Sequence, residues 1–151
     1  MSGSNRNWPT TAARGRASFA KAPLPSSGNS VAVKPEPRPE GKNAPQILAA
    51  EAGRLRARLP RDAILVALDE RGKDLTTREF AARLRGWMDE SRPVAFLVGG
   101  ADGLDPALKR EASFQLRLSS LTLPHALAQL VLCEQLYRAV SLLRGHPYHR
   151  D

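Results

Sequence analysis

Two short apolar runs, ILVAL at residues 64–68 and VAFLV at residues 94–98, constrain the fold of this chain more than any other feature. Each run lies between polar flanks and has the length of a strand that is buried on both faces. Between them, Thr76 and Glu79 have the spacing of a capping box, which predicts a helix to about Glu90. Strands that alternate with helices predict an α/β domain with a mainly parallel sheet.

Further elements are predicted around these two strands. Residues 47–59 combine helical spacing with good helix formers. Asp105 and Pro106 form a typical helix start, and this helix is expected to run to about Gln115. Residues 31–33, with the sequence VAV, are a candidate edge strand.

The last and longest helix is expected from Pro124 to near Gly145, with Thr122 as a possible cap. Its apolar residues cover much of the circumference, which is typical of a buried helix, so one side is a candidate subunit interface. Glu134 and Arg138 have the favourable i,i+4 order of an ion pair. They form either an ordinary ion pair or a partly buried, functional pair at that interface.

The first third of the chain has a different composition. Residues 1–46 hold seven basic and two acidic residues, and seven of the twelve prolines. Because residues 1–30 contain no four-residue apolar run, we expect a basic, proline-rich, mostly disordered arm there, which forms no strand of the central sheet. The folded domain is then expected over residues 31–151.

Three alternatives are open for this arm. It could contact RNA phosphates through its basic residues. It could be an organelle transit peptide, because residues 1–34 hold Arg and Ser but no acid. Residues 17–22 could instead dock against an open sheet edge, where unpaired backbone groups need a partner.

Composition excludes several classes of protein. No run of 18 apolar residues occurs, so no membrane span is expected, and without an apolar signal segment at the start we expect a cytoplasmic protein. The single cysteine, Cys133, excludes an internal disulfide and a multi-cysteine zinc site, and we expect no metal. The net charge of +8 indicates a polyanionic partner, such as nucleic acid or an acidic membrane surface. With 5% aromatic residues, base stacking on an aromatic platform is not expected.

Ligand sites in open parallel sheets lie beyond the carboxyl ends of the strands. Leu68 ends the first apolar run, and Gly99 opens a GGADG loop after the second. This loop matches neither the dinucleotide fingerprint nor the P-loop, and a tight turn would also explain it. Residues 118–125 lead into a helix N-terminus, where backbone groups could bind an adenine edge or an anion, or simply cap the helix.

The tail, residues 146–151, has the sequence HPYHRD. It concentrates hydrogen-bonding groups, and an arginine can clamp phosphate. No third ligand has metal-site spacing, and no nucleophile elbow supports a Ser/His/Asp triad.

From about residue 31 onward the chain resembles the RlmH family of SPOUT-class methyltransferases. The matching segments, in the family's order, are LVALDERGK (65–73), FLVGGADGL (96–104), LRLSSLTLPHAL (116–127), EQLYRA (134–139) and HPYHR (146–150). The resemblance implies a SPOUT-type α/β knot, with a C-terminal trefoil knot, and a homodimer. It implies methylation of N3 of a pseudouridine in 23S ribosomal RNA, free or within the assembled ribosome.

The resemblance also implies S-adenosyl-L-methionine as cofactor. Its site would fall on Leu68, Gly99, Leu118, Ser119, Ser120, Leu121, Thr122 and Leu123. A side chain at Gly99 is expected to block the cofactor while the fold stays intact.

Catalytic roles are expected in the tail and the last helix. A base must take the N3 proton, and we favour His149 over Tyr148 and Glu134, because a histidine accepts protons near neutral pH. Arg138 and Arg150 are expected to hold RNA phosphate or the base carbonyls.

The first 30 residues depart from the family, whose members begin with an apolar strand and an aromatic-containing helix. The match here begins at VAVKPEP, residues 31–37. The main alternative to an active enzyme is therefore a noncatalytic RNA-binding or structural remnant that lost its first strand. An unrelated basic, ribosome-associated protein is a third reading, which the ordered motifs disfavour.

Overall fold

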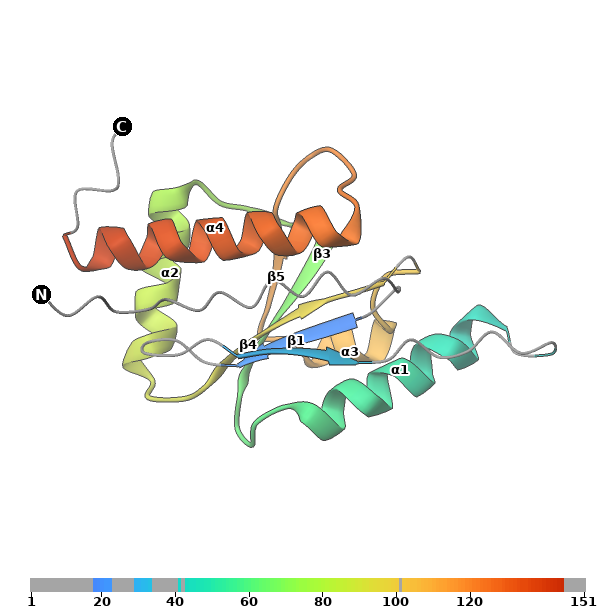
Figure 1. The fold of residues 1–151 in the computed structure, drawn as a ribbon. Coiled ribbons are helices and arrows are strands. Elements are labelled where there is room, and N and C mark those ends of the chain that lie inside the picture. Colours follow the sequence, from blue (N-terminus) through green and yellow to red (C-terminus); the bar gives the residue numbers. More distant parts are fainter. Residues whose placement is uncertain (1–17, 23–28, 34–40, 42, 101, 146–151) are drawn as a thin grey trace, which may run out of the picture.

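The two apolar runs form neighbouring parallel strands in the middle of a five-stranded sheet of order β2-β1-β4-β3-β5. In the computed structural model the described residues are 18–22, 29–33, 41, 43–100 and 102–145. The elements are β1 (Ser18–Ala22), β2 (Asn29–Val33), α1 (Ala44–Arg58), β3 (Ile64–Asp74), α2 (Thr77–Asp89), β4 (Val94–Val98), α3 (Pro106–Glu111), β5 (Phe114–Arg117) and α4 (His125–Leu143). Helices α2 and α4 cover one face of the sheet, and α1 and α3 cover the other (Figure 1).

Strands β4, β3 and β5 are parallel, which confirms the predicted mixed α/β class. Side chains alternate between the two faces of a strand, so each buried strand supplies both core layers. In β4, for example, Phe96 packs toward α2 and α4, whereas Leu97 packs toward α1 and α3. The Phe96 ring meets Phe80 and Trp87 edge-on, with ring centroids 6.2 Å apart in both pairs.

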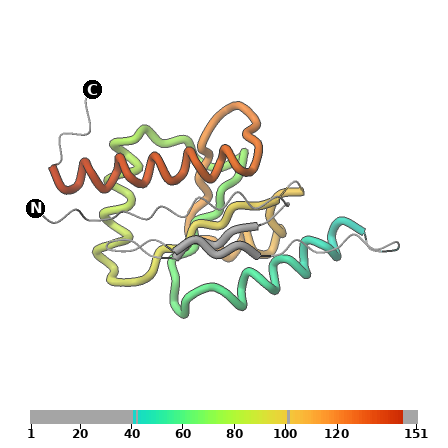
Figure 2. The backbone as a smooth tube through the Cα atoms, in the orientation of Figure 1, coloured from blue at the N-terminus to red at the C-terminus, as the bar shows by residue number. Residues whose placement is uncertain are grey.

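The helix starts follow from local hydrogen bonding. The predicted capping box is confirmed, because the Thr76 hydroxyl accepts from the Glu79 amide and the Glu79 carboxylate accepts from the Thr76 amide. A second capping box joins Asn43 and Gln46, so α1 begins before the predicted residue 47. Helices α2 and α4 then cross on one face of the sheet (Figure 2).

Two predictions around the C-terminal elements are wrong. The helix that begins after Asp105 ends at Glu111, not near Gln115, because residues 114–117 pair with β3 as strand β5. Helix α4 begins after Pro124 and has no side-chain cap, so Thr122 does not cap it. The segment that the implied knot would thread includes residues 146–151, which lie outside the described residues, and the knot stays a prediction.

The expectation that residues 1–30 form no strand of the central sheet is also wrong. β1 pairs antiparallel with β4, with Phe19 opposite Val98, and β2 then forms the edge predicted at residues 31–33. This is the alternative in which residues 17–22 dock on the open edge. The physical reason is that strand pairing uses backbone groups, which need no apolar run. Residues 1–17 and 23–28 lie outside the described residues.

Candidate functional site

A cavity of about 770 Å³ lies at the carboxyl end of β4, where β3 parts from β4 after Ala67. The loop between β5 and α4 forms its other wall. Seven of the eight predicted cofactor residues line it: Leu68, Gly99, Leu118, Ser119, Leu121, Thr122 and Leu123. The eighth, Ser120, is exposed in the same loop and is not among the lining residues. Three segments that are far apart in the sequence therefore meet at one cavity of ligand size.

The glycine loop after β4 is closed on itself. The Gly103 amide donates to the Gly100 carbonyl at 3.0 Å, and Gly103 has a left-handed φ of 80°. A Cβ at Gly99 would lie 2.5 Å from the Gly103 carbonyl carbon, which is closer than any allowed contact distance. The expectation that a side chain at Gly99 leaves the fold intact is therefore wrong, because the residue is needed first for the close approach of its own loop.

A four-residue bulge in β3 forms the next part of the wall. Leu68 and Lys73 both stand opposite Leu116 of β5, so residues 69–72 loop out between them. A Cβ at Gly72 would lie 2.7 Å from the Leu116 carbonyl carbon, so a side chain here would force the strands apart. The bulge brings Asp69 to the cavity; with Leu68 it marks the strand end where the sequence predicts a ligand, but the sequence analysis gave its side chain no role.

Asp69 is the most buried charged group of this wall, with 7% of its side chain exposed. Its carboxylate contacts the Lys109 ammonium directly and accepts the Arg71 amide at 2.9 Å. Burial opposes ionisation, but the hydrogen bonds from Lys109 and Arg71 outweigh it and lower the pKa of Asp69 below its usual value. The ion pair therefore ties the β3 bulge to α3.

Lys109→Met is expected to lower the free energy of unfolding at pH 7 by ~1–3 kcal/mol, because Asp69 would keep a half-compensated charge. Since the pKa of folded Asp69 is lowered, the stabilisation is present above the unfolded pKa of about 3.9 and is lost as the pH falls through the folded pKa. Urea denaturation at several pH values measures this effect. Arg110→Met, one residue on and exposed, is the matched control. A Lys109→Met deficit that stayed constant below about pH 4 would contradict the pairing.

A second ion pair, which is bidentate, closes the far end of the bulge. The Arg117 guanidinium donates to both carboxylate oxygens of Asp74, with Nε 2.7 Å from Oδ1. The hydrogen bonds from Arg117 lower the pKa of Asp74. Arg117 also lines the cavity, so its position at the mouth is fixed by β3.

His125 joins two of the cavity walls, and the sequence analysis placed it in the candidate ligand segment 118–125 but gave its side chain no role. Its Nδ1 lies 2.5 Å from the Gly99 carbonyl oxygen, and its Nε2 lies 3.0 Å from the Gln129 side-chain nitrogen. That segment was chosen for its backbone groups, and no sequence signal marked the His125 side chain.

Two of the predicted catalytic residues, Glu134 and Arg138, lie away from the cavity lining. Glu134 and Arg138 form the expected ion pair, with Nε 2.7 Å from Oε1, and both side chains are partly exposed. Neither lines the cavity. Glu134 follows Ala128, the last residue of α4 that lines the cavity, by six residues, which is about 9 Å along the helix. Tyr148, His149 and Arg150 lie outside the described residues.

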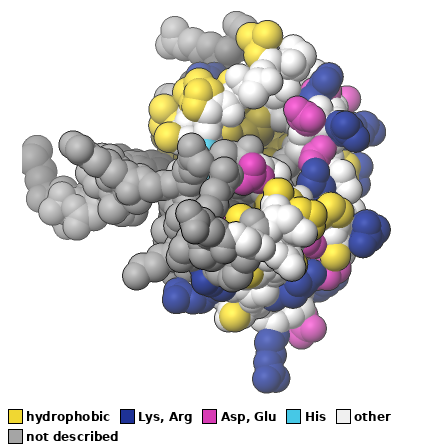
Figure 3. Space-filling model, turned by 90° about the vertical axis from the view of Figure 1, so that its right-hand side faces the viewer, with side chains coloured by type: hydrophobic (Ala, Val, Ile, Leu, Met, Phe, Trp, Pro, Cys, Tyr) yellow, Lys and Arg dark blue, Asp and Glu magenta, His cyan; other side chains and the backbone are white. Residues whose placement is uncertain are grey.

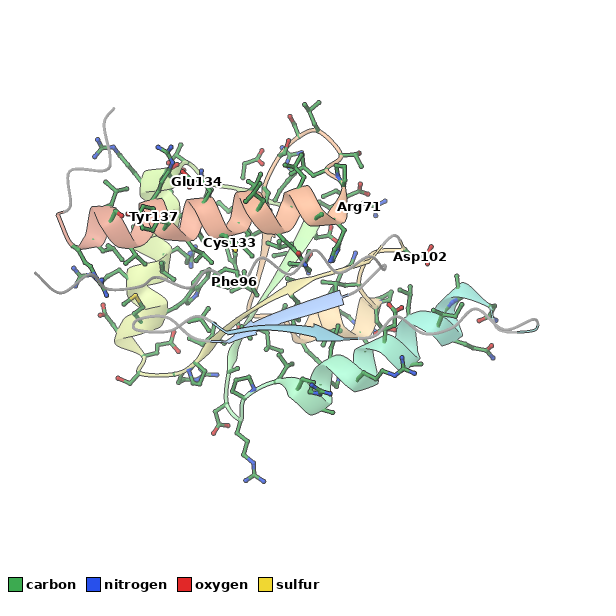
Figure 4. The ribbon with its side chains drawn as sticks, in the orientation of Figure 1. Arg71, Phe96, Asp102, Cys133, Glu134 and Tyr137 are labelled. Atoms are coloured by element: carbon green, nitrogen blue, oxygen red, sulfur yellow. The ribbon has the colours of Figure 1, made fainter. Side chains whose placement is uncertain are left out.

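The outer face of α4 exposes large apolar side chains. Leu130 is 66% exposed, Leu127 42% and Tyr137 36%, and Figure 4 shows Cys133, Glu134 and Tyr137 along the same helix. By length and composition α4 could cross a membrane, but a single helix of this kind in the described part of the chain is weak evidence. An exposed apolar helix face in a small domain instead indicates a contact surface.

The face that carries the cavity has mixed polarity. Figure 3 shows hydrophobic side chains gathered near its top and in a hollow, with acidic and basic side chains close together along one side. Apolar leucines and charged residues of both signs line the cavity. In the described ranges no group of three or more His, Cys, Asp or Glu side chains could hold a metal ion.

Residues 16–149 match the family model described as "Predicted SPOUT methyltransferase". A protein of Verminephrobacter eiseniae named "Ribosomal RNA large subunit methyltransferase H" is 61% identical over 120 residues, 80% of this chain and 77% of the relative. Proteins of the same name from Dechloromonas aromatica and Paraburkholderia phytofirmans are 57% and 55% identical, over 79% and 78% of this chain and 76% of each relative.

Proposed function

We propose that this chain, which belongs to the SPOUT methyltransferase family, transfers a methyl group to ribosomal RNA of the large subunit. The observation that carries the proposal is the cavity, because three separate loops, each expected at the cofactor, form its walls. The relatives' names support the RNA substrate. Within 23S ribosomal RNA we propose N3 of a pseudouridine as the target, and the cytoplasm, where ribosomes work, as the location.

We propose S-adenosyl-L-methionine as the cofactor, and the residues of the cavity fit it. Leu68, Leu118 and Leu121 offer apolar surface to an adenine ring. The backbone around Gly99 and Leu123 offers hydrogen-bonding groups, as adenine recognition needs. Acidic and basic side chains at the mouth, Asp102 and Arg117 among them, suit an amino acid moiety that carries both charges. When bound, the cofactor supplies a methyl group that its sulfonium has already activated.

The protein must then position the pseudouridine of the RNA and remove the proton from its N3. Correct positioning of the reacting groups can supply a large part of the rate enhancement, and a nearby proton acceptor adds to it. We assign the removal of this proton to His149, with Tyr148 and Glu134 as the other candidates. We assign to Arg138 and Arg150 the binding of RNA phosphate or of the base carbonyls. These roles rest on residue chemistry and on the resemblance of the tail.

A homodimer would solve a problem of distance. Glu134 and Arg138 lie six and ten residues along α4 from Ala128, the last residue of this helix that lines the cavity, and the outer face of the helix is apolar and exposed. A second copy packed on this face would bury Leu130 and bring residues of the partner close to Glu134 and Arg138. We therefore propose that the active form is a dimer through α4 and that the apolar face serves protein contact, not a membrane.

The alternative, a noncatalytic RNA-binding or structural remnant, rested on the missing first strand. β1 occupies the free edge of β4, so the sheet is complete on that side and the alternative loses its main support.

The test is transfer of tritiated methyl groups from S-adenosyl-L-methionine to ribosomes that lack this modification. Mass analysis of the digested nucleosides then identifies the product. We expect methylpseudouridine from ribosomes, with free 23S ribosomal RNA compared in parallel. Label in no nucleoside, with cofactor binding retained, would favour the remnant, and label in a different nucleoside would overturn the target.

A further inference from the structure

A hydrogen bond links the His125 ring to the Gly99 carbonyl oxygen. It joins the first residue of α4 to the residue that follows β4, two positions that are 26 residues apart. Both residues line the cavity, and each belongs to one of its walls. The bond therefore spans the cavity boundary at the point where the cofactor loops meet.

The partners define which ring nitrogen carries the proton. A carbonyl oxygen can only accept, so Nδ1 of His125 donates to Gly99. The Gln129 amide nitrogen can only donate, so Nε2 accepts from it. The ring is thus held at both nitrogens, with Nδ1–H directed at the Gly99 carbonyl, and its orientation is fixed by α4 itself.

The Gly99 carbonyl is a suitable anchor because its loop has little freedom. The Gly100–Gly103 hydrogen bond closes the loop, and Gly99 is packed against the Gly103 and Leu104 backbone. Helix α4, in contrast, starts without a side-chain cap of its own. His125 therefore fastens a loosely started helix, and the loop that leads into it, to a rigid turn.

We infer that His125 is a positioning residue for the cofactor, which acts as a latch between the Gly99 turn and the loop of residues 118–124. The inference rests on the proposed function. Its physical effect is preorganisation: with the latch closed, the binding conformation is populated before the cofactor arrives, and the cofactor does not have to order the loop. His125 itself takes no part in methyl transfer.

The chain allows a matched set of variants. Asparagine can place its amide nitrogen close to the position of Nδ1, so His125→Asn keeps the donor to Gly99. Glutamine places its amide further out, near the position of Nε2, so His125→Gln loses that donor while staying polar. His125→Ala removes both nitrogens.

Cofactor affinity is measured by calorimetry on the full-length chain with S-adenosyl-L-methionine. We expect His125→Ala and His125→Gln to bind about 5- to 10-fold more weakly, the effect of one neutral hydrogen bond, and His125→Asn to regain most of the affinity. Methyl transfer at saturating cofactor should stay within about 2-fold of the wild type, since the latch is not a chemical group of the reaction.

A readout without cofactor completes the test. Amide exchange at Ala128, whose amide donates to the Pro124 carbonyl in the first turn of α4, should become faster in His125→Ala and His125→Gln but not in His125→Asn, because the helix start loses its tie to the Gly99 turn. Unchanged affinity in His125→Ala, or equal weakening in all three variants, would overturn the latch. A wild-type chain that binds no S-adenosyl-L-methionine would instead overturn the proposed function, so the two failures are distinct.

Discussion

His149→Ala is expected to reduce methyl transfer to ribosomes by roughly one to three orders of magnitude, the range for loss of a positioned acid–base group. Arg150→Ala should cause a loss of similar size if it clamps the RNA. Cofactor affinity should change much less in either variant, because the proposed cofactor residues lie in other loops. Single-turnover rates with saturating cofactor, together with calorimetry, separate the two effects.

The tail provides its own control. His146 is also a histidine of this segment, but it carries no assigned role, so His146→Ala should retain most of the activity. A wild-type rate for His149→Ala would show that the base assignment is wrong. A rate that falls equally for His146→Ala and His149→Ala would indicate that the tail acts through its conformation and not through one proton acceptor.

Leu130→Asp is expected to convert a dimer into monomers or into insoluble protein. Leu130 is 66% exposed in the single chain, on the apolar face of α4. A carboxylate there would be buried without a partner in a symmetric contact, and each interface would carry it twice. Tyr137→Asp should act in the same direction. Methyl transfer should fall with the dimer fraction, since the active form is proposed to need both copies.

Light scattering over a concentration series measures this effect, with Ala82→Asp on the exposed face of α2 as the matched control. The control should remain dimeric and active. A wild-type chain that is monomeric at micromolar concentration would contradict the proposed dimer, and a dimeric Leu130→Asp would place the contact elsewhere.

The parts of the fold that the sequence predicts are those with a strong local signal. β4 is buried along its whole length, so its apolar run predicted both bounds, and the Thr76 capping box predicted the start of α2. β5 was missed because only Leu116 among its residues is fully buried, and the preceding helix signal extended over it. β1 was missed because its pairing depends on the backbone edge of β4, which no local pattern records.

The site divides in the same way. Strand ends and glycines mark the cavity loops, since a parallel sheet places its ligands beyond its carboxyl ends. The side chains that hold those loops in place have no comparable signal in the sequence. Lys109 meets Asp69, and His125 meets Gly99, only after the sheet has brought distant segments together. Side chains that act on a neighbouring loop thus require the tertiary structure, whereas the loops themselves do not.

The antiparallel pairing of β1 with β4 affects which substitutions β1 can accept. Phe19 to Lys21 align with Phe96 to Val98 through main-chain atoms, which every residue except proline supplies in full. Pairing with β4 therefore excludes proline at the paired positions but does not by itself specify the other residues. Substitutions other than proline in β1 can therefore leave its backbone hydrogen bonds to β4 in place, so the edge of the parallel strands stays covered.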